Sequence, residues 1–133
     1  MDQKTYCMIK PDAVARGLIG RIVGRLEDVG LTVERLEFGM VTPAQAAANY
    51  AEHEGKPFYA GLVEYITSGP VVKMVLAGPD AVPVVRKLMG ATNPKDAAPG
   101  TIRGDYGLTL DANIIHGSDS PESAEREIAI FFS

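Results

Sequence analysis

The spacing of apolar residues along the first part of the chain changes from strand-like to helix-like and back. The apolar run over residues 5–9 stops at Pro11, which predicts a buried strand ended by proline. Apolar residues then recur at every third or fourth position over residues 19–29, which is typical of an amphipathic helix, and Gly30 is a common helix end. Residues 31–40 alternate between apolar and charged side chains, which predicts a second strand.

The middle of the chain carries signals for where helices begin. Residues 42–45 (Thr-Pro-Ala-Gln) form a capping box with proline at the first helical position, and they predict a helix that continues to about Glu52. Helical spacing over residues 58–66 predicts another helix, and the β-branched run 70–76 predicts a strand. Residues 80–88 return to helical spacing.

The last part of the chain combines a long irregular stretch with a final strand and helix. Residues 90–111 are rich in Gly, Pro, Asn and Asp, and loops of this length in compact domains are usually functional or disordered. A short apolar run predicts a strand ending at Ile115, and residues 121–131 predict a helix capped by Ser120. This order predicts an α+β fold for residues 1–133 as one domain: ferredoxin-like split βαβ units that form a four-stranded antiparallel sheet with helices packed on it.

Composition narrows the class of protein. The 133 residues are 46% hydrophobic and 23% charged, which is typical of a soluble globular domain. The formal net charge of −4 argues against a general nucleic-acid-binding role. The single cysteine, Cys7, allows no intramolecular disulfide, and the sequence shows neither a signal peptide nor an apolar run of about 18 residues. We therefore expect a cytoplasmic protein without a membrane span.

His116 is the residue that says most about which reaction the protein could catalyse. It is one of two histidines, and it follows the last predicted strand and precedes Gly-Ser-Asp-Ser, a cluster of turn-forming and cap-forming residues. Imidazole is one of the few side chains that can attack an electrophile and leave again at neutral pH. A lone histidine is more often a surface or core residue, so its meaning depends on the residues that accompany it.

The other candidate residues have phosphate recognition in common. Phosphate-loop, dinucleotide-binding and protein-kinase motifs are missing from the sequence, and the spacing of His53 and His116 does not suggest a metal site, so we expect no metal bound by protein side chains. Cations and neutral donors do occur near the ends of predicted elements: Lys10, Arg86, Arg103, Thr92 and Asn113. Each cation alone would most often be a surface charge, but together they are suited to binding phosphate oxygens.

Seven segments in a fixed order resemble the nucleoside diphosphate kinase family, and together they extend over nearly the whole chain. They are residues 9–12, 16–18, 53–58 with Tyr50, 67–71, 88–94, 99–105 and 113–120. The last segment alone would be modest evidence, but several blocks in the right order make coincidence untenable. No catalytic motif position departs from the family pattern.

The resemblance implies a phosphotransferase. In this family the γ-phosphate of a nucleoside triphosphate passes to a nucleoside diphosphate by a ping-pong mechanism, through a phosphohistidine that would form here on His116. Such an enzyme balances cellular NTP and dNTP pools, and Mg²⁺ is carried by the nucleotide phosphates. The resemblance also implies a set of phosphate-binding residues: Lys10, Arg86, Thr92 and Arg103. Asn113 would hold the sugar 3′-hydroxyl together with Lys10.

The remaining roles follow from the same resemblance. Phe58 would stack on the base, and Tyr50 would lie near the transferred phosphate. Ser118 and Glu127 would orient the histidine, and we expect Glu127 to act through Ser118. Family members form tetramers or hexamers built from dimers, so a homo-oligomer is expected, with contacts through residues 90–111.

Two other interpretations fit the residues less well. A ferredoxin-like RNA-binding module would need aromatic residues on the central strands and a basic surface, and this chain is acidic. A catalytically inactive family member that serves as an interaction protein would lack the histidine or the loop arginine, and His116 and Arg103 are both present. We therefore expect nucleoside tri- and diphosphates as partners, and neither nucleic acid nor a membrane.

Overall fold

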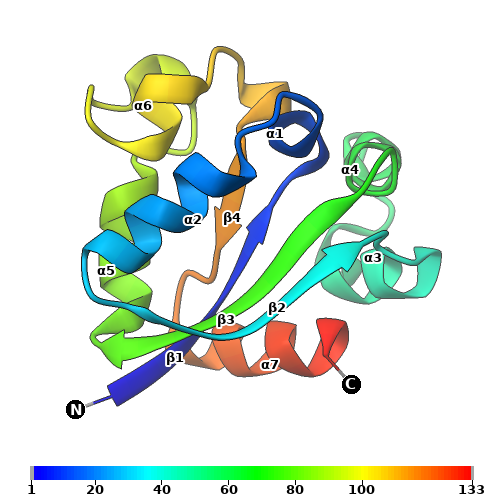
Figure 1. Ribbon diagram of the computed structural model, residues 1–133. Coiled ribbons are helices and arrows are strands. Elements are labelled where there is room, and N and C mark those ends of the chain that lie inside the picture. The colour runs from blue at the N-terminus through cyan, green and yellow to red at the C-terminus, as the bar shows by residue number, and fades with distance from the viewer. Residues whose placement is uncertain (1, 133) are drawn as a thin grey trace.

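The computed structural model describes residues 2–132 and has a four-stranded sheet at its centre (Figure 1). The strands are β1 (Asp2–Ile9), β2 (Thr32–Gly39), β3 (Val71–Pro79) and β4 (Ile115–Gly117). They lie in the order β2-β3-β1-β4, and every neighbouring pair is antiparallel. β1 and β2 therefore run parallel on either side of β3, as split βαβ units require, and the predicted fold class is confirmed.

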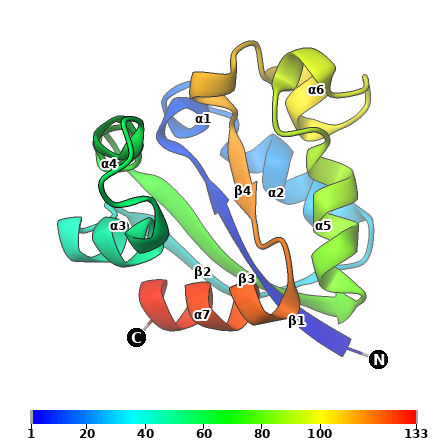
Figure 2. The ribbon, with the colours of Figure 1, turned by 180° about the vertical axis from the view of Figure 1, so that it is seen from behind.

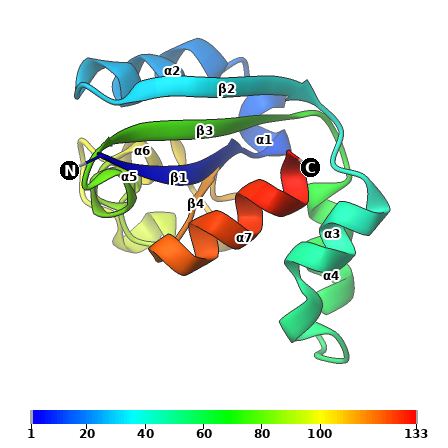
Figure 3. The ribbon, with the colours of Figure 1, turned by 90° about the horizontal axis from the view of Figure 1, so that it is seen from below.

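Helices cover both faces of this sheet. They are α1 (Pro11–Ala15), α2 (Ile19–Asp28), α3 (Pro43–Asn49), α4 (Tyr59–Ile66), α5 (Ala81–Met89), α6 (Ile102–Tyr106) and α7 (Pro121–Phe131). The view from behind shows α5 beside β4, and the view from below shows α2 and α7 on opposite sides of the sheet (Figures 2 and 3). The sheet is thus the middle layer between two sets of helices.

Alternation along β1 divides the core into two clusters. Cys7 and Ile9 are fully buried in the cluster beneath α2 and α5. Tyr6 and Met8 point the other way and pack with residues of α3, α4 and α7, including Phe131, whose ring stacks on Tyr6 with centroids 4.8 Å apart. Since successive side chains of a strand point to opposite faces, a strand in the middle of three layers must be apolar on both. This explains the continuous apolar run from which the strand was predicted.

β2 differs from the central strands because it lies at the edge of the sheet. Leu36 and Phe38 pair with Met74 and Val72, which belong to the core beneath α2, yet they remain 50% and 59% exposed. Met40 is also half exposed. The strand was predicted correctly, but its apolar face is not buried within the described part of the chain.

Several short elements were missed or misplaced by the sequence analysis. The proline that ends β1 also begins α1, because a ring-locked φ suits the first position of a helix. The helix predicted to reach Glu52 ends at Asn49, and a separate 3₁₀ turn follows over Ala51–His53. The stretch 90–111, expected to be irregular, contains α6 and a 3₁₀ turn, Pro94–Asp96, and a second 3₁₀ turn, Leu110–Ala112, begins at its end. Such elements are too short to show helical periodicity.

Candidate active site

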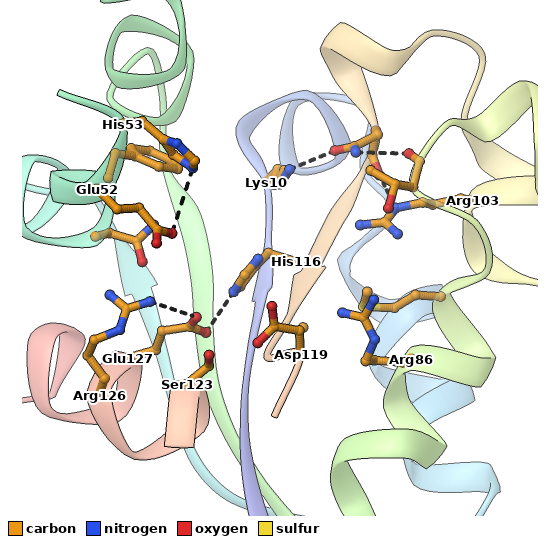
Figure 4. A pocket seen from close by; sticks show the side chains of 16 residues that line it. Lys10, Glu52, His53, Arg86, Arg103, His116, Asp119, Ser123, Arg126 and Glu127 are labelled. Carbon is orange, nitrogen blue, oxygen red and sulfur yellow. Dashed lines mark hydrogen bonds and ion pairs between the residues drawn. The ribbon is translucent and has the colours of Figure 1, made fainter. Parts of the chain in front are cut away.

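A cavity of about 410 Å³ opens between the α3–α4 segment, β4 and α5, and charged side chains dominate its wall (Figure 4). Eight residues that the sequence analysis selected line it: Lys10, Tyr50, Arg86, Thr92, Arg103, Asn113, His116 and Glu127. They come from segments that lie far apart in the sequence, and the sheet and its helices bring them together.

His116 lies in the middle of β4, so the strand begins at Ile115 and does not end there as predicted. Its Nε2 is 2.7 Å from Oε1 of Glu127, and Oγ of Ser118 donates to the same carboxylate oxygen at 2.8 Å. The expectation that Glu127 acts through Ser118 is therefore wrong, because α7 packs close enough to β4 for the carboxylate to meet the ring directly. A Glu127 carboxylate that accepts from Nε2–H leaves Nδ1 as the ring nitrogen with a free lone pair.

The surroundings of Glu127 fix this contact. Glu127 is buried, and its other oxygen, Oε2, lies 3.6 Å from Nη2 of Arg126. Ser118 is fully buried behind it, where its Oγ also accepts from the backbone N–H of Tyr6 at 3.3 Å. The carboxylate is thus held by Ser118 on one oxygen and by Arg126 on the other, and it holds the imidazole in turn.

Gly117 lets β4 approach α5 closely. A Cβ at this position would lie 2.6 Å from Sδ of Met89 and 3.0 Å from Cγ1 of Val85. Both side chains belong to the packed core of α5. A larger residue would therefore push β4, and with it His116, away from the helix that carries Arg86.

Lys10 is bound to Asn113 at the inner end of the cavity. Its Nζ donates to Oδ1 of Asn113 at 2.6 Å, and Nδ2 of Asn113 donates to the carbonyl of Thr92 at 3.1 Å. Burial, and then the nearby charge of Arg103, lower the pKa of Lys10 to about 8 against the opposing effect of the Asp12 carboxylate. A cation destabilised in this way gains from an anionic ligand that replaces its lost hydration.

Arg103 lines the cavity as expected, but the expectation that it lies in a loop is wrong. It lies on α6, is only 5% exposed, and donates to three backbone carbonyls, those of Asn113, Gly90 and Ile115, at 3.2, 3.1 and 2.7 Å. The unpredicted helix turns the side chain inward. Burial, and then the charge of Arg86, lower the pKa of Arg103 to about 10. The guanidinium therefore supports the backbone beside His116 as well as facing the cavity.

Arg86 and Asp119 both line the cavity, and Figure 4 shows them in its lower part. Arg86 lies on α5 and is exposed. Hydrogen bonding from Ser123 holds the pKa of Asp119 below its usual range against a smaller effect of burial, and the charge of Arg86 adds to the lowering. Asp119 was not selected from the sequence, although its place three residues after His116 was a signal for it.

The outer wall of the cavity is less fixed. Tyr50 lines it, and burial raises the pKa of its hydroxyl, which therefore stays protonated and able to donate. Phe58 is not part of the cavity wall; it is 51% exposed at the rim, where its ring lies 5.2 Å from that of His53. His53 does line the cavity, as do other residues that the sequence analysis missed: Asn49, Glu52, Met89, Gly117, Ser123 and Arg126.

The cavity wall is better suited to binding an anion than to binding a metal ion. Among residues 2–132, no group of three or more His, Cys, Asp and Glu side chains is placed to hold a metal ion. The positive side chains around His116 instead suit a polyanion that brings its own counterion.

Among residues 2–132, no helix is both long and apolar enough to cross a membrane.

Comparison with known proteins gives one consistent result. A family model described as Nucleoside diphosphate kinase matches residues 3–133. A nucleoside diphosphate kinase from Moorella thermoacetica is 57% identical over 131 residues, which are 98% of this chain and 94% of the relative. One from Archaeoglobus fulgidus is 56% identical over 98% of this chain and 87% of its own length. A solved structure of a halophilic nucleoside diphosphate kinase from Halobacterium salinarum in complex with CDP superposes with a TM-score of 0.96 at 56% identity, covering 100% of this chain and 89% of that one.

Proposed function

This chain belongs to the nucleoside diphosphate kinase family, and from that premise we propose that it moves the γ-phosphate of a nucleoside triphosphate to a nucleoside diphosphate through a phosphohistidine on His116. The observation that carries the proposal is the contact of Glu127 with Nε2 of His116, which leaves Nδ1 free toward the cavity. A neutral imidazole is nucleophilic only at the nitrogen without a proton.

The transfer proceeds in two balanced halves. The lone pair of Nδ1 forms a bond to the γ-phosphorus while the bond to the β,γ-bridging oxygen breaks, and the nucleoside diphosphate leaves with that electron pair. The Glu127 carboxylate stabilises the positive charge that the ring acquires. A terminal oxygen of the acceptor diphosphate then attacks the same phosphorus, and the electrons of the nitrogen–phosphorus bond return to the imidazole.

Positioned charge supplies most of the stabilisation in this reaction. Phosphoryl transfer spreads negative charge over the equatorial oxygens, and fixed cations in a partly buried site interact with it strongly. Lys10, Arg86 and Arg103 are the cations of the cavity that we assign to this task, with Thr92 and the Tyr50 hydroxyl as neutral donors. Mg²⁺ would be held by the nucleotide phosphates, where it neutralises part of their charge; the cationic wall fits a metal that is not bound by the protein itself.

The sugar and base have fewer partners. We assign the 3′-hydroxyl to Asn113 and Lys10, whose side chains already bind each other at 2.6 Å and could both reach one hydroxyl. We assign base stacking to Phe58 at the rim, beside His53. An aromatic face accepts every base, so these assignments favour a broad substrate range.

We also propose a homo-oligomer, with the exposed edge of the sheet as its first contact. The half-exposed Leu36 and Phe38 lie on β2 and Met40 directly follows it. β2 is an edge strand, so its outer backbone groups can pair with another strand. The stretch 90–111 carries the exposed Leu108 and Leu110 and is a second candidate contact, consistent with assembly beyond a dimer. A role in balancing cytoplasmic nucleotide pools agrees with a buried, unpaired Cys7.

A coupled assay tests the proposed function. Purified protein with Mg²⁺, ATP and a second nucleoside diphosphate should form the corresponding triphosphate, with parallel reciprocal plots as both substrates are varied. Intersecting plots would contradict a covalent intermediate. His116→Ala should be inactive in the same assay while its nucleotide binding, measured separately, is retained.

A further inference from the structure

A strained turn precedes the β-strand that carries His116. Ile114 has a φ of +77°, although it is β-branched, and it is fully buried. The N–H of Ile115 donates to the carbonyl of Asn113 at 2.8 Å and closes a three-residue turn around Ile114. A residue of this type at positive φ is unfavourable, so the surrounding structure must hold the turn in place.

The carboxylate of Asp12 provides part of that hold. Its Oδ2 accepts from the backbone N–H of Ile114 at 3.1 Å, and the carbonyl of Ile114 accepts from the backbone N–H of Lys10 at 2.9 Å. The other oxygen, Oδ1, accepts from the hydroxyl of Tyr65 on α4. Both oxygens of Asp12 are thus engaged, and neither Asp12 nor Tyr65 lines the cavity.

The turn leads directly to the reacting groups. His116 follows two residues later and pairs with Met8 in the short contact between β4 and β1. Arg103 binds the carbonyls on both sides of Ile114, and Lys10 binds the side chain of Asn113. A shift of this turn would therefore move the nucleophile relative to the cations around it. Misplacement by about 1 Å can slow an enzyme by about 10²-fold.

We propose that Asp12 is a positioning residue for phosphoryl transfer: by fixing the N–H of Ile114, it holds the strained turn that aims His116. The inference rests on the proposed function of His116. Tyr65 assists by orienting the Asp12 carboxylate, and its ring also lies 5.8 Å from Nζ of Lys10. The carboxylate therefore connects α4 to the turn beside the nucleophile.

Three variants and a control separate positioning from general stability. Asp12→Ala removes the acceptor, Asp12→Asn keeps an oxygen that can accept from Ile114, and Tyr65→Phe removes only the support of the carboxylate. Asp28→Asn, an exposed carboxylate on α2, is the control. The measurement is the single-turnover rate at which γ-labelled ATP phosphorylates His116, normalised to the number of sites that label, together with the dissociation constant of ATP and the unfolding midpoint.

The expected results differ among these variants. Asp12→Ala should slow labelling per site about 10²-fold, with the ATP dissociation constant within about threefold, because the defect is in aim and not in binding. Asp12→Asn should recover most of the rate, and Tyr65→Phe should lose less than about tenfold. A lower unfolding midpoint with an unchanged rate per site would overturn the proposal, as would equal losses in Asp12→Ala and Asp12→Asn.

A second background tests the role of strain. Glycine adopts positive φ freely, so Ile114→Gly should make the anchor less necessary. In that background Asp12→Ala should slow labelling by less than about tenfold, measured where both variants are folded. The same loss of about 10²-fold in both backgrounds would contradict positioning through the turn. If the wild-type protein itself does not label on His116, the proposed function fails, whereas labelling that is indifferent to Asp12 removes this inference alone.

Discussion

The two walls of the cavity are built differently. On the wall that we assign to the phosphates, Arg103 is 5% exposed and bound to three carbonyls, and Lys10 is bound to Asn113. On the wall that we assign to the base, His53 lines the cavity and Phe58 lies beyond it at the rim. Phe58 is 51% exposed, and its neighbours are the ring of His53 and the ammonium group of Lys56. One wall is fixed by directional bonds, whereas the other presents an exposed aromatic surface at the rim.

This difference matches what each part of a nucleotide requires. Charge that develops on a transferring phosphoryl group is stabilised only by groups already in place, since reorganisation adds to the barrier. A site that must bind every base needs an aromatic face for stacking and no base-specific hydrogen bonds. The phosphate wall should therefore be intolerant of change, and the base wall tolerant of it.

The largest effect should come from the two histidines, one on each wall. His116→Ala should lose transfer by about 10⁴-fold or more, because no other group can accept the phosphate. His53→Ala should lose less than about tenfold, since that ring only supports the rim. Steady-state rates with ATP and a second diphosphate measure both. Comparable losses in the two variants would contradict the distinction between the walls.

The next effect separates two arginines on the phosphate side. Arg103→Ala should slow transfer about 10²- to 10³-fold and should also lower the free energy of unfolding by about 2–4 kcal/mol, since it leaves three carbonyls without their donor. Arg86→Ala should lose similar activity with little loss of stability, because its side chain is exposed. Urea unfolding alongside kinetics tests the pair. A normal midpoint for Arg103→Ala would mean that its carbonyl contacts are not stabilising.

A smaller effect concerns the base. The values of kcat/KM for ATP, GTP, CTP and UTP against one acceptor should differ by about ten- to thirtyfold, with purines favoured because their larger ring stacks more. Removal of the 3′-hydroxyl should cost about 10²-fold, because Lys10 and Asn113 lose a partner. A thousandfold preference for one base would reveal a specific contact on the base wall.

The smallest effect is a pH dependence set by Lys10. Burial holds the pKa of its ammonium near 8 in the free protein, so the group loses its charge as pH rises through that value. If the charged form binds phosphate, kcat/KM should be about fivefold lower at pH 9 than at pH 8. Lys10→Arg should move this fall to higher pH. A profile that is flat to pH 9.5 in the wild type would show that the Lys10 charge is not required.

The sequence predicts elements whose apolar pattern extends over many residues. It does not predict contacts that depend on a few residues and on how elements pack. The two-sided apolar runs of β1 and β3 predict the central strands because the sheet is buried on both faces. Nothing in the spacing predicts that α6 turns Arg103 inward, since a five-residue helix shows no period. The candidate residues were selected by residue type and resemblance, whereas the direct contact between Glu127 and His116 depends on how α7 packs against β4.

The exposure of β2 shows a related limit. Alternation along residues 31–40 predicts a strand with an apolar face, but it does not tell whether that face meets this chain or another. The structure leaves Leu36 and Phe38 half exposed. Light scattering on Phe38→Glu should show loss of the proposed dimer, whereas a wild-type monomer at micromolar concentration would contradict the assembly.

The most direct test of the account is the position of the phosphate on His116. Protein incubated with Mg²⁺ and γ-labelled ATP, without an acceptor, should carry a label that is acid-labile and base-stable. Digestion and comparison with the two phosphohistidine standards should place it on Nδ1, because Glu127 holds Nε2 at 2.7 Å. Label on Nε2, or on a serine, would contradict the account.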